Sequence, residues 1–211
     1  MAVSPDDTTG TGLAGPVGLF GGSFDPPHLA HLSLARTALR QLGLTELRWL
    51  PVGQPWQKAG RQLAAPAHRL AMVQALVAGE PRFVVDTTEL MRAGPSYMID
   101  TVEALQSRFP QRREWFLVIG QDQYARLSSW HRWQDLLKRL TLAVAARAGQ
   151  AVSAAPEVAA VAHRVVRLDM PALEISSTLL RGQCLRGEDI TPMVGDGVAR
   201  YIAQHRLYSE H

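Results

Sequence analysis

Short apolar runs alternate along this chain with stretches in which apolar residues recur every three or four positions. Residues 115–119 (WFLVI) have the length and composition of a buried strand, whereas residues 29–42 (LAHLSLARTALRQL) have the spacing of a helix. Residues 147–164 are rich in Ala, Gly and Ser, and we expect an irregular connection there. The pattern predicts strands at 16–21, 46–52, 82–86, 115–119, 141–146 and 165–168, and helices at 29–42, 66–78, 96–109, 176–186 and 191–205.

This alternation of strands and helices predicts the α/β class, with a Rossmann-like doubly wound parallel sheet and C-terminal helices. We expect a single domain over residues 16–211, preceded by a disordered tail at 1–15 that lacks the basic start and apolar stretch of a signal peptide. Ligands bind such sheets at the carboxyl ends of the strands, near the point where the strand order reverses. The chemistry is therefore expected just after strands one, two, four and six.

The composition of the chain limits the classes of partner that we expect. Hydrophobic residues make up 46% of the 211 residues, enough for a core, and a net charge of +3 with a pI near 9.4 suits anionic ligands. No Lys/Arg-rich run predicts a nucleic-acid partner, and no apolar run is long enough to predict a membrane span. The single cysteine, Cys184, excludes an internal disulfide and a multi-cysteine zinc site, so we expect a reducing, cytoplasmic location. Whether the chain forms a homo-oligomer stays open, since no coiled-coil pattern marks an interface.

The segment at 21–31 (GGSFDPPHLAH) joins the first predicted strand to the first helix. Its two glycines allow backbone amides to approach a ligand closely. His28 and His31 lie three apart, where the free amides and the dipole of a helix attract anions. Imidazoles at this place can donate hydrogen bonds to phosphate oxygens and become charged. The alternative is a tight turn with two solvent-facing histidines, and zinc is not indicated because no Cys or carboxylate has the supporting spacing.

A second candidate segment lies near the C-terminus, at residues 175–181 (ISSTLLR). Ser176 or Ser177 can cap the predicted helix and leave further amides for phosphate. Arg181 follows about one turn later, with a side chain long enough to reach back to that end. For this segment alone, an ordinary capped helix with a surface arginine remains the alternative.

The two segments resemble, in the same order, the GxFxPxHxGH and ISSTxxR signatures of the nucleotidylyltransferase superfamily. The resemblance implies that the first loop binds ATP and that its two histidines contact the phosphates. Ala30 departs from the pattern, which has Gly there, and we expect a slight narrowing of the loop. The resemblance implies His28, His31 and Arg181 as catalytic residues. The ATP-binding residues it implies are Gly21, Gly22, Ser23, Phe24, Gly120, Asp122, Ile175, Ser176 and Ser177.

Three further segments resemble bacterial nicotinate mononucleotide adenylyltransferases, and the similarity runs in order from Val17 to Tyr208. They are residues 120–137, with GQD followed by LSSWHRWQDLL, residues 95–97 (PSY) followed by Thr101, and the loop at 50–58 (LPVGQPWQK). The resemblance implies an enzyme of NAD biosynthesis that transfers the adenylyl group of ATP to nicotinate mononucleotide.

The acceptor end of this predicted site depends on a few residue types. Trp130 offers a flat face for a pyridine ring, with helix packing as the alternative. Backbone amides near Tyr97 and His131 could receive a ring carboxylate, and Lys58 could meet the negative charge of the acceptor. Asp122 would accept hydrogen bonds from the ribose of the adenylate, or else cap the short helix after the fourth strand. The acceptor-binding residues expected are Lys58, Ser96, Tyr97, Trp130 and His131.

The expected mechanism needs no side-chain nucleophile, because the acceptor phosphate oxygen is already an anion. That agrees with the lack of a convincing Ser/His/Asp or Cys/His arrangement in the sequence. Catalysis is then expected to rest on positioning and charge stabilisation, with Mg²⁺ held mainly by the substrate phosphates and no protein ligand assigned. Three alternatives remain: transfer to nicotinamide mononucleotide, transfer to phosphopantetheine, and a non-catalytic nucleotide-binding module.

Overall fold

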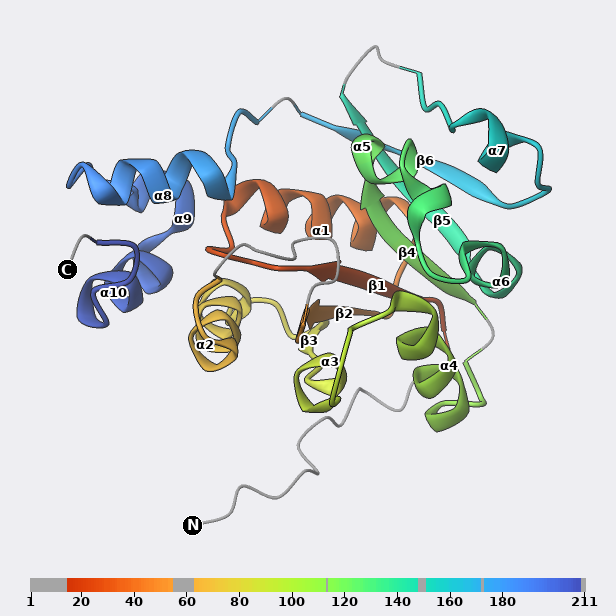
Figure 1. The fold of residues 1–211 in the computed structure, drawn as a ribbon, viewed down its shortest axis with the longest axis horizontal. Helices are drawn as coiled ribbons and strands as arrows, with labels where there is room; N and C mark the ends of the chain where they lie inside the picture. The colour runs from red at the N-terminus through yellow and green to blue at the C-terminus, as the bar shows by residue number, and fades with distance from the viewer. Residues whose placement is uncertain (1–14, 55–62, 113, 148–150, 172, 210–211) are drawn as a thin grey trace.

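The central element of the fold is a six-stranded sheet (Figure 1). A computed structural model describes residues 15–54, 63–112, 114–147, 151–171 and 173–209. Every pair of neighbouring strands is parallel, in the order β3-β2-β1-β4-β5-β6. The order therefore reverses between β1 and β4. The strands are β1 (Val17–Gly22), β2 (Glu46–Pro51), β3 (Phe83–Val85), β4 (Trp115–Gly120), β5 (Thr141–Arg147) and β6 (Val165–Met170).

Helices cover both faces of the sheet. One buried cluster packs α4 and α6 against one face, and a second packs α1 and α2 against the other. The last three helices stand together beside α2, drawn in blue in Figure 1. The helices are α1 (Leu29–Gln41), α2 (Pro66–Val77), α3 (Thr88–Met91), α4 (Met98–Arg108), α5 (Gln121–Tyr124), the 3₁₀ turn η2 (Leu127–Ser129), α6 (Trp133–Arg139), α7 (Pro156–Ala159), α8 (Ser177–Leu185), α9 (Thr191–Val194) and α10 (Asp196–Gln204).

This architecture confirms the predicted fold class: a Rossmann-like, doubly wound parallel sheet followed by C-terminal helices. The prediction of a single helix over 191–205 is wrong, because two helices, α9 and α10, occupy this range. Gly195 lies between α9 and α10 with φ of +80°, a conformation that breaks a right-handed helix. The connection predicted to be irregular contains the short helix α7. The predicted tail at 1–15 lies outside the described residues, except for Gly15.

The apolar strands explain where the core lies. On one face of the sheet, Leu19, Leu117 and Leu142 are fully buried with residues of α4 and α6. On the other face, Leu47 and Trp49 are fully buried with residues of α1 and α2. Burying a side chain of this size stabilises a fold by about 1.5–3 kcal/mol. Among the described residues, no helix is long and apolar enough to cross a membrane.

Four charged side chains are buried together around β2, and we call Arg48, Glu46, Asp86 and Arg112 the β2 ion cluster. Arg48 forms ion pairs with Glu46 and, at 2.8 Å, with Asp86. Arg112 lies 3.3 Å from Glu46. Burial alone would raise the pKa of Asp86, but hydrogen bonds from Thr88 and Arg48 hold it below its ordinary value. The cluster therefore consists of compensated charges.

Candidate active site

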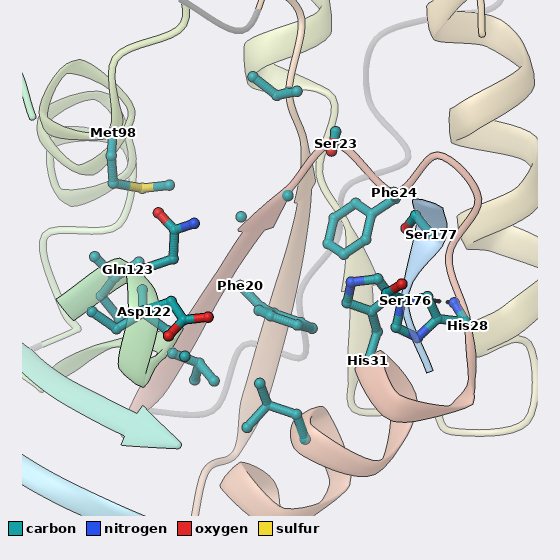
Figure 2. Close-up of a pocket in the computed structure, with 18 of the residues that line it drawn as sticks. Phe20, Ser23, Phe24, His28, His31, Met98, Asp122, Gln123, Ser176 and Ser177 are labelled. Carbon is teal, nitrogen blue, oxygen red and sulfur yellow. Dashed lines mark hydrogen bonds between the residues drawn. The ribbon is translucent and has the colours of Figure 1, made fainter. Parts of the chain in front are cut away.

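A cleft of about 700 Å³ opens at the carboxyl ends of β1 and β4, where the strand order reverses. Figure 2 shows its two sides. His28, His31, Ser176 and Ser177 gather on one side, and Met98, Asp122 and Gln123 lie on the other. Val52, after β2, also lines the cleft. The loops that follow strands one, two, four and six therefore all reach the cleft, as the strand pattern predicts.

The loop after β1 is tightly packed. Phe24 is 1% exposed and has φ of +48°, which is uncommon for a residue other than glycine. A Cβ atom on Gly22 would lie 2.9 Å from the Phe24 ring, and one on Gly21 would lie 2.6 Å from the Met98 methyl group. The two glycines thus allow the side chains of Phe24 and Met98 to approach the end of β1. Gly21, Gly22, Ser23 and Phe24 all line the cleft.

His28 and His31 lie face to face at the start of α1. Their rings are stacked with centroids 3.7 Å apart, and the backbone N–H of His28 donates to Nδ1 of His31 at 3.2 Å. His28 is the N-cap residue and is 5% exposed, and its own Nδ1 has no hydrogen-bond partner among the described residues. Burial lowers the pKa of His28 from 6.5 to about 4. Burial therefore favours the neutral imidazole at neutral pH, and a bound anion would favour the charged form.

The start of α8 forms the adjoining wall of the cleft. Ser176 is its N-cap, and the Ser176 hydroxyl accepts from the N–H of Leu179 at 3.2 Å. The Ser177 hydroxyl instead donates to the Pro26 carbonyl at 2.9 Å. Ile175, Ser176 and Ser177 all line the cleft, so α8 presents its N-terminal end to the same space as α1.

Arg181 binds the loop after β1 directly. Its Nη1 donates to the Asp25 carbonyl at 2.6 Å, and its Nη2 donates to the Thr178 hydroxyl at 3.1 Å. Arg181 is not among the described residues that line the cleft. This arginine therefore lies next to the histidine side of the cleft and joins the two signature segments.

Asp122 lies on the opposite wall, in the first turn of α5. Gly120 is the N-cap of that helix, with no side-chain cap hydrogen bond, so the structure does not support the capping interpretation of Asp122. The Asp122 side chain is exposed at the rim, and Gly120 also lines the cleft. A carboxylate in this position is available to ribose hydroxyl groups.

The predicted acceptor residues are only partly brought together. Trp130 lines the cleft, and its Nε1 is buried with no hydrogen-bond partner among the described residues. The rings of Tyr97 and His131 lie 4.3 Å apart against each other, outside the described lining. The Ser96 hydroxyl lines the cleft but accepts from the N–H groups of Gly53 and Gln54, so it also holds the loop after β2. Lys58 lies outside the described residues.

Sequence reasoning missed several cleft residues, above all Glu89 and Met98. Glu89 is 3% exposed and accepts a hydrogen bond from Thr101. Burial raises the pKa of Glu89 to about 7, although Thr101 and Arg92 act in the opposite direction. The position of Glu89 soon after a predicted strand was an available signal, but no motif marked it. Met98 stands directly after the PSY segment and adds an apolar surface opposite the histidines.

The described residues contain no group of three or more His, Cys, Asp or Glu side chains that could hold a metal ion. The arrangement of the cleft suits an extended anion instead. Two helix N-termini and two imidazoles lie at one side, and an exposed carboxylate and a partly buried tryptophan lie at the other. Helix N-termini attract anions, so the cleft has the room and the charge distribution to accept an anionic small molecule at the side formed by α1 and α8.

Comparison with known proteins adds independent findings. The family described as cytidylyltransferase-like matches residues 19–183. A protein of Methylibium petroleiphilum named "Probable nicotinate-nucleotide adenylyltransferase" is 49% identical over 197 residues, which covers 92% of each chain. A protein of Albidiferax ferrireducens with the same name is 44% identical, covering 91% of this chain and 97% of its own. A solved structure of Plasmodium falciparum nicotinic acid mononucleotide adenylyltransferase complexed with NaAD has a TM-score of 0.75, covering 92% of this chain and 97% of that one. Its 16% identity supports the fold alone.

Proposed function

Because this chain belongs to the nicotinate-nucleotide adenylyltransferase family, we propose that it transfers the adenylyl group of ATP to nicotinate mononucleotide and releases pyrophosphate. The observation that carries the proposal is the meeting of two signature segments, about 150 residues apart in sequence, on one side of the cleft. Each segment brings the N-terminal end of a helix to that cleft. Such ends bind phosphate well, because their backbone N–H groups have no partners inside the helix.

In the proposed reaction, a phosphate oxygen of the acceptor attacks the α-phosphorus of ATP as pyrophosphate leaves on the opposite side. The bond from the α-phosphorus to its bridging oxygen breaks as the new phosphorus–oxygen bond forms. No side chain has to act as nucleophile, since the attacking oxygen is already an anion. The protein contributes alignment of the two substrates and stabilisation of the charge that develops on the leaving group.

We assign the charge stabilisation to His28, His31 and Arg181. His28 is neutral in the unliganded site because burial lowers its pKa to about 4. A triphosphate beside its unpartnered Nδ1 would favour the protonated form, so substrate binding and protonation of this histidine should be coupled. Arg181 already lies against the same loop through the Asp25 carbonyl.

We propose that Mg²⁺ accompanies ATP and is held mainly by substrate phosphates. The ion would supply neutralisation of charge on the phosphate oxygens. Asp122 is the exposed carboxylate on the cleft wall, and we assign it to the ribose rather than to the metal.

For the acceptor, we propose that the pyridine ring stacks on Trp130 and that its carboxylate is received near Tyr97 and His131. The names of the two bacterial relatives support nicotinate mononucleotide as the acceptor. The Trp130 face at the cleft supports ring stacking. Movement of the Tyr97–His131 pair toward the cleft would be required for direct contact, because the two rings now lie against each other outside the described lining.

We further propose that the chain works in the cytoplasm, with small nucleotides rather than nucleic acid or membrane as partners. The sequence contains no Lys/Arg-rich run, and its single cysteine, Cys184, is a free thiol. A reducing compartment suits a free thiol.

The test of the proposed function is pyrophosphate release from ATP and Mg²⁺ with three acceptors measured in parallel: nicotinate mononucleotide, nicotinamide mononucleotide and phosphopantetheine. We expect kcat/KM to be highest for nicotinate mononucleotide, by at least about tenfold over the nicotinamide form, which corresponds to about 1.4 kcal/mol. Preference for another acceptor would overturn the nicotinate assignment. ATP binding with no release of pyrophosphate for any acceptor would favour a non-catalytic nucleotide-binding module.

A further inference from the structure

A tyrosine at the C-terminal end of the described chain contacts the loop after β1. Tyr208 follows α10, and its hydroxyl donates to Oδ1 of Asp25 at 2.7 Å, across 183 positions of sequence. The residue before it is fixed as well, because the Leu207 N–H donates to the Ile202 carbonyl at 3.0 Å. The C-terminal helices thus reach the same turn that precedes His28 and His31.

Asp25 is the centre of the contacts in that turn. Its side chain is 1% exposed, and Oδ1 also accepts from the N–H of Ala64 at 3.2 Å. Its carbonyl accepts from Arg181, and the next carbonyl, that of Pro26, accepts from Ser177. The position of Asp25 therefore affects both signature segments together.

The second carboxylate oxygen of Asp25, Oδ2, lies near Arg181, so the Tyr208 contact can affect that arginine. Oδ2 is buried and has no hydrogen-bond partner among the described residues, and Nη1 of Arg181 lies 3.8 Å from it. That distance is too long for a hydrogen bond, but a modest rotation of the carboxylate would form one. The two groups already form an ion pair at this distance, and a direct hydrogen bond would strengthen it and further reduce the attraction of Arg181 for phosphate oxygens.

Arg69 is the second cation near Asp25, and it is not available to bind phosphate in place of Arg181. Arg69 is 1% exposed and donates to three carbonyls, those of Ala64, Ser23 and Gly53. Its guanidinium is therefore committed to the backbone. Tyr208 remains a proton donor, since burial and the adjacent Asp25 both raise the pKa of its hydroxyl.

We propose that Tyr208 is a positioning residue for ATP: its hydroxyl keeps the Asp25 carboxylate at the 3.8 Å ion-pair distance and out of a direct hydrogen bond with Arg181, so that the guanidinium can turn to the phosphates. The inference rests on the proposed function insofar as it takes Arg181 to bind the phosphates of ATP. It adds the C-terminal end of the chain to the determinants of ATP affinity.

Two matched variants test the proposal. Tyr208→Phe removes only the hydroxyl that holds Asp25. Tyr201→Phe removes a hydroxyl from the same C-terminal region, where it pairs with Nδ1 of His68 at 3.0 Å. We expect Tyr208→Phe to raise the calorimetric Kd for ATP, measured without acceptor, by about tenfold. Tyr201→Phe should change that Kd by less than about twofold. The melting temperature should fall more in Tyr208→Phe, because its hydroxyl donates to a buried carboxylate, so both variants are titrated well below their melting temperatures.

The role of the Asp25 charge is tested with Asp25→Asn, alone and combined with Tyr208→Phe. An amide carries no charge to neutralise Arg181, so the additional effect of Tyr208→Phe on ATP affinity should fall below about threefold in this background. An undiminished tenfold effect would overturn the proposed route through Asp25. Unchanged ATP affinity in Tyr208→Phe would overturn the proposal itself, as would a loss that merely follows unfolding of the variant.

The binding measurement separates this proposal from the proposed function. Wild-type protein that binds ATP but transfers nothing to nicotinate mononucleotide would contradict the proposed reaction. In that case the comparison of ATP affinity between the two tyrosine variants would still decide whether Tyr208 positions the phosphate site.

Discussion

Two buried polar regions of this molecule differ in where their partners lie. In the β2 ion cluster, Arg48 has carboxylates on both sides, and Glu46 has a second cation in Arg112. All of these charges are compensated by other residues of the chain. Removing one member of such a group leaves its partners buried and uncompensated, which is strongly destabilising.

The cleft shows the opposite arrangement. Nδ1 of His28, Oδ2 of Asp25 and Nε1 of Trp130 are buried with no hydrogen-bond partner among the described residues. Atoms without such a partner also occur away from the cleft, as at Nε1 of Trp49 and Oε1 of Gln183, so they do not by themselves mark a ligand site. His28 and Trp130, however, line an open cleft in which a ligand can supply the partner. The difference teaches that the β2 ion cluster should control stability, whereas the cleft residues should control substrate binding and rate.

The largest expected effect is on the β2 ion cluster. Arg48→Ala removes a guanidinium that is 1% exposed and leaves Glu46 and Asp86 without it. We expect the free energy of unfolding to fall by about 3–5 kcal/mol, measured by urea denaturation. The control is Arg82→Ala, which breaks a pair with Glu80 in which the arginine side chain is 45% exposed and should cost less than about 1 kcal/mol. Equal losses in the two variants would contradict the contrast between buried and exposed pairs.

The next effect is catalytic. His31→Ala is expected to lower kcat by ~10²–10³, the usual loss for one electrostatic group in such a site. The unfolding free energy should fall by about 1–3 kcal/mol, because the imidazole accepts a hydrogen bond from the His28 backbone and packs against the rings of Phe20, Phe24 and His28. His205→Ala, at an exposed position after α10, serves as the control and should keep its kcat. A His31→Ala variant with more than half of the wild-type kcat would refute the phosphate role.

A smaller effect concerns the acceptor ring. Trp130→Ala should lower kcat/KM about three- to tenfold for both pyridine mononucleotides, since stacking is worth about 0.5–1.5 kcal/mol and does not depend on the ring substituent. The preference for the acid over the amide should therefore survive. Trp133→Ala, whose ring packs against the core rather than lining the cleft, separates ring stacking from structural loss. If the preference for the acid over the amide disappeared only in Trp130→Ala, the indole would be shown to discriminate between the two ring substituents.

The smallest effect is a shift in protonation. His28 has a folded pKa of about 4, below its ordinary value of 6.5, because burial disfavours the charged imidazole. This lowered pKa makes the folded state less stable as the pH falls from about 6.5 toward 4, since the unfolded chain then binds the proton more readily. NMR titration of labelled histidines should give a midpoint near 4 without ATP. Bound ATP should raise it by at least about one unit, equivalent to about 1.4 kcal/mol. An unchanged midpoint would show that the phosphates do not reach His28.

Much of the fold could be predicted from the sequence, because local patterns determine it. The strand at 115–119 and the helix at 29–42 occur within two residues of their predicted ends. The prediction of one helix over 191–205 failed at Gly195, because the helical spacing of apolar residues continues through a residue whose φ angle is not helical. A pattern of side chains does not report the φ angle of a glycine.

The candidate site divides in the same way. The segments that hold His28 and Ser176 could be identified because their residues are adjacent in sequence. The contact of Tyr208 with Asp25 could not, because it joins positions 183 apart and no local spacing encodes it. The two hydrogen bonds that the Ser96 hydroxyl accepts from the loop after β2 were invisible for the same reason.

The three carbonyls bound by Arg69 have a consequence for the energetics of ligand binding. The guanidinium connects the loop after β1 with the loop after β2 and the segment before α2. The loops after β1 and β2, which contribute Ser23 and Val52 to the lining of the cleft, are therefore preorganised, and substrates do not have to order them. Ordering each mobile side chain typically removes about 0.5–1.5 kcal/mol from affinity. A buried arginine that does not itself line the cleft can in this way increase the affinity of the cleft for its substrates.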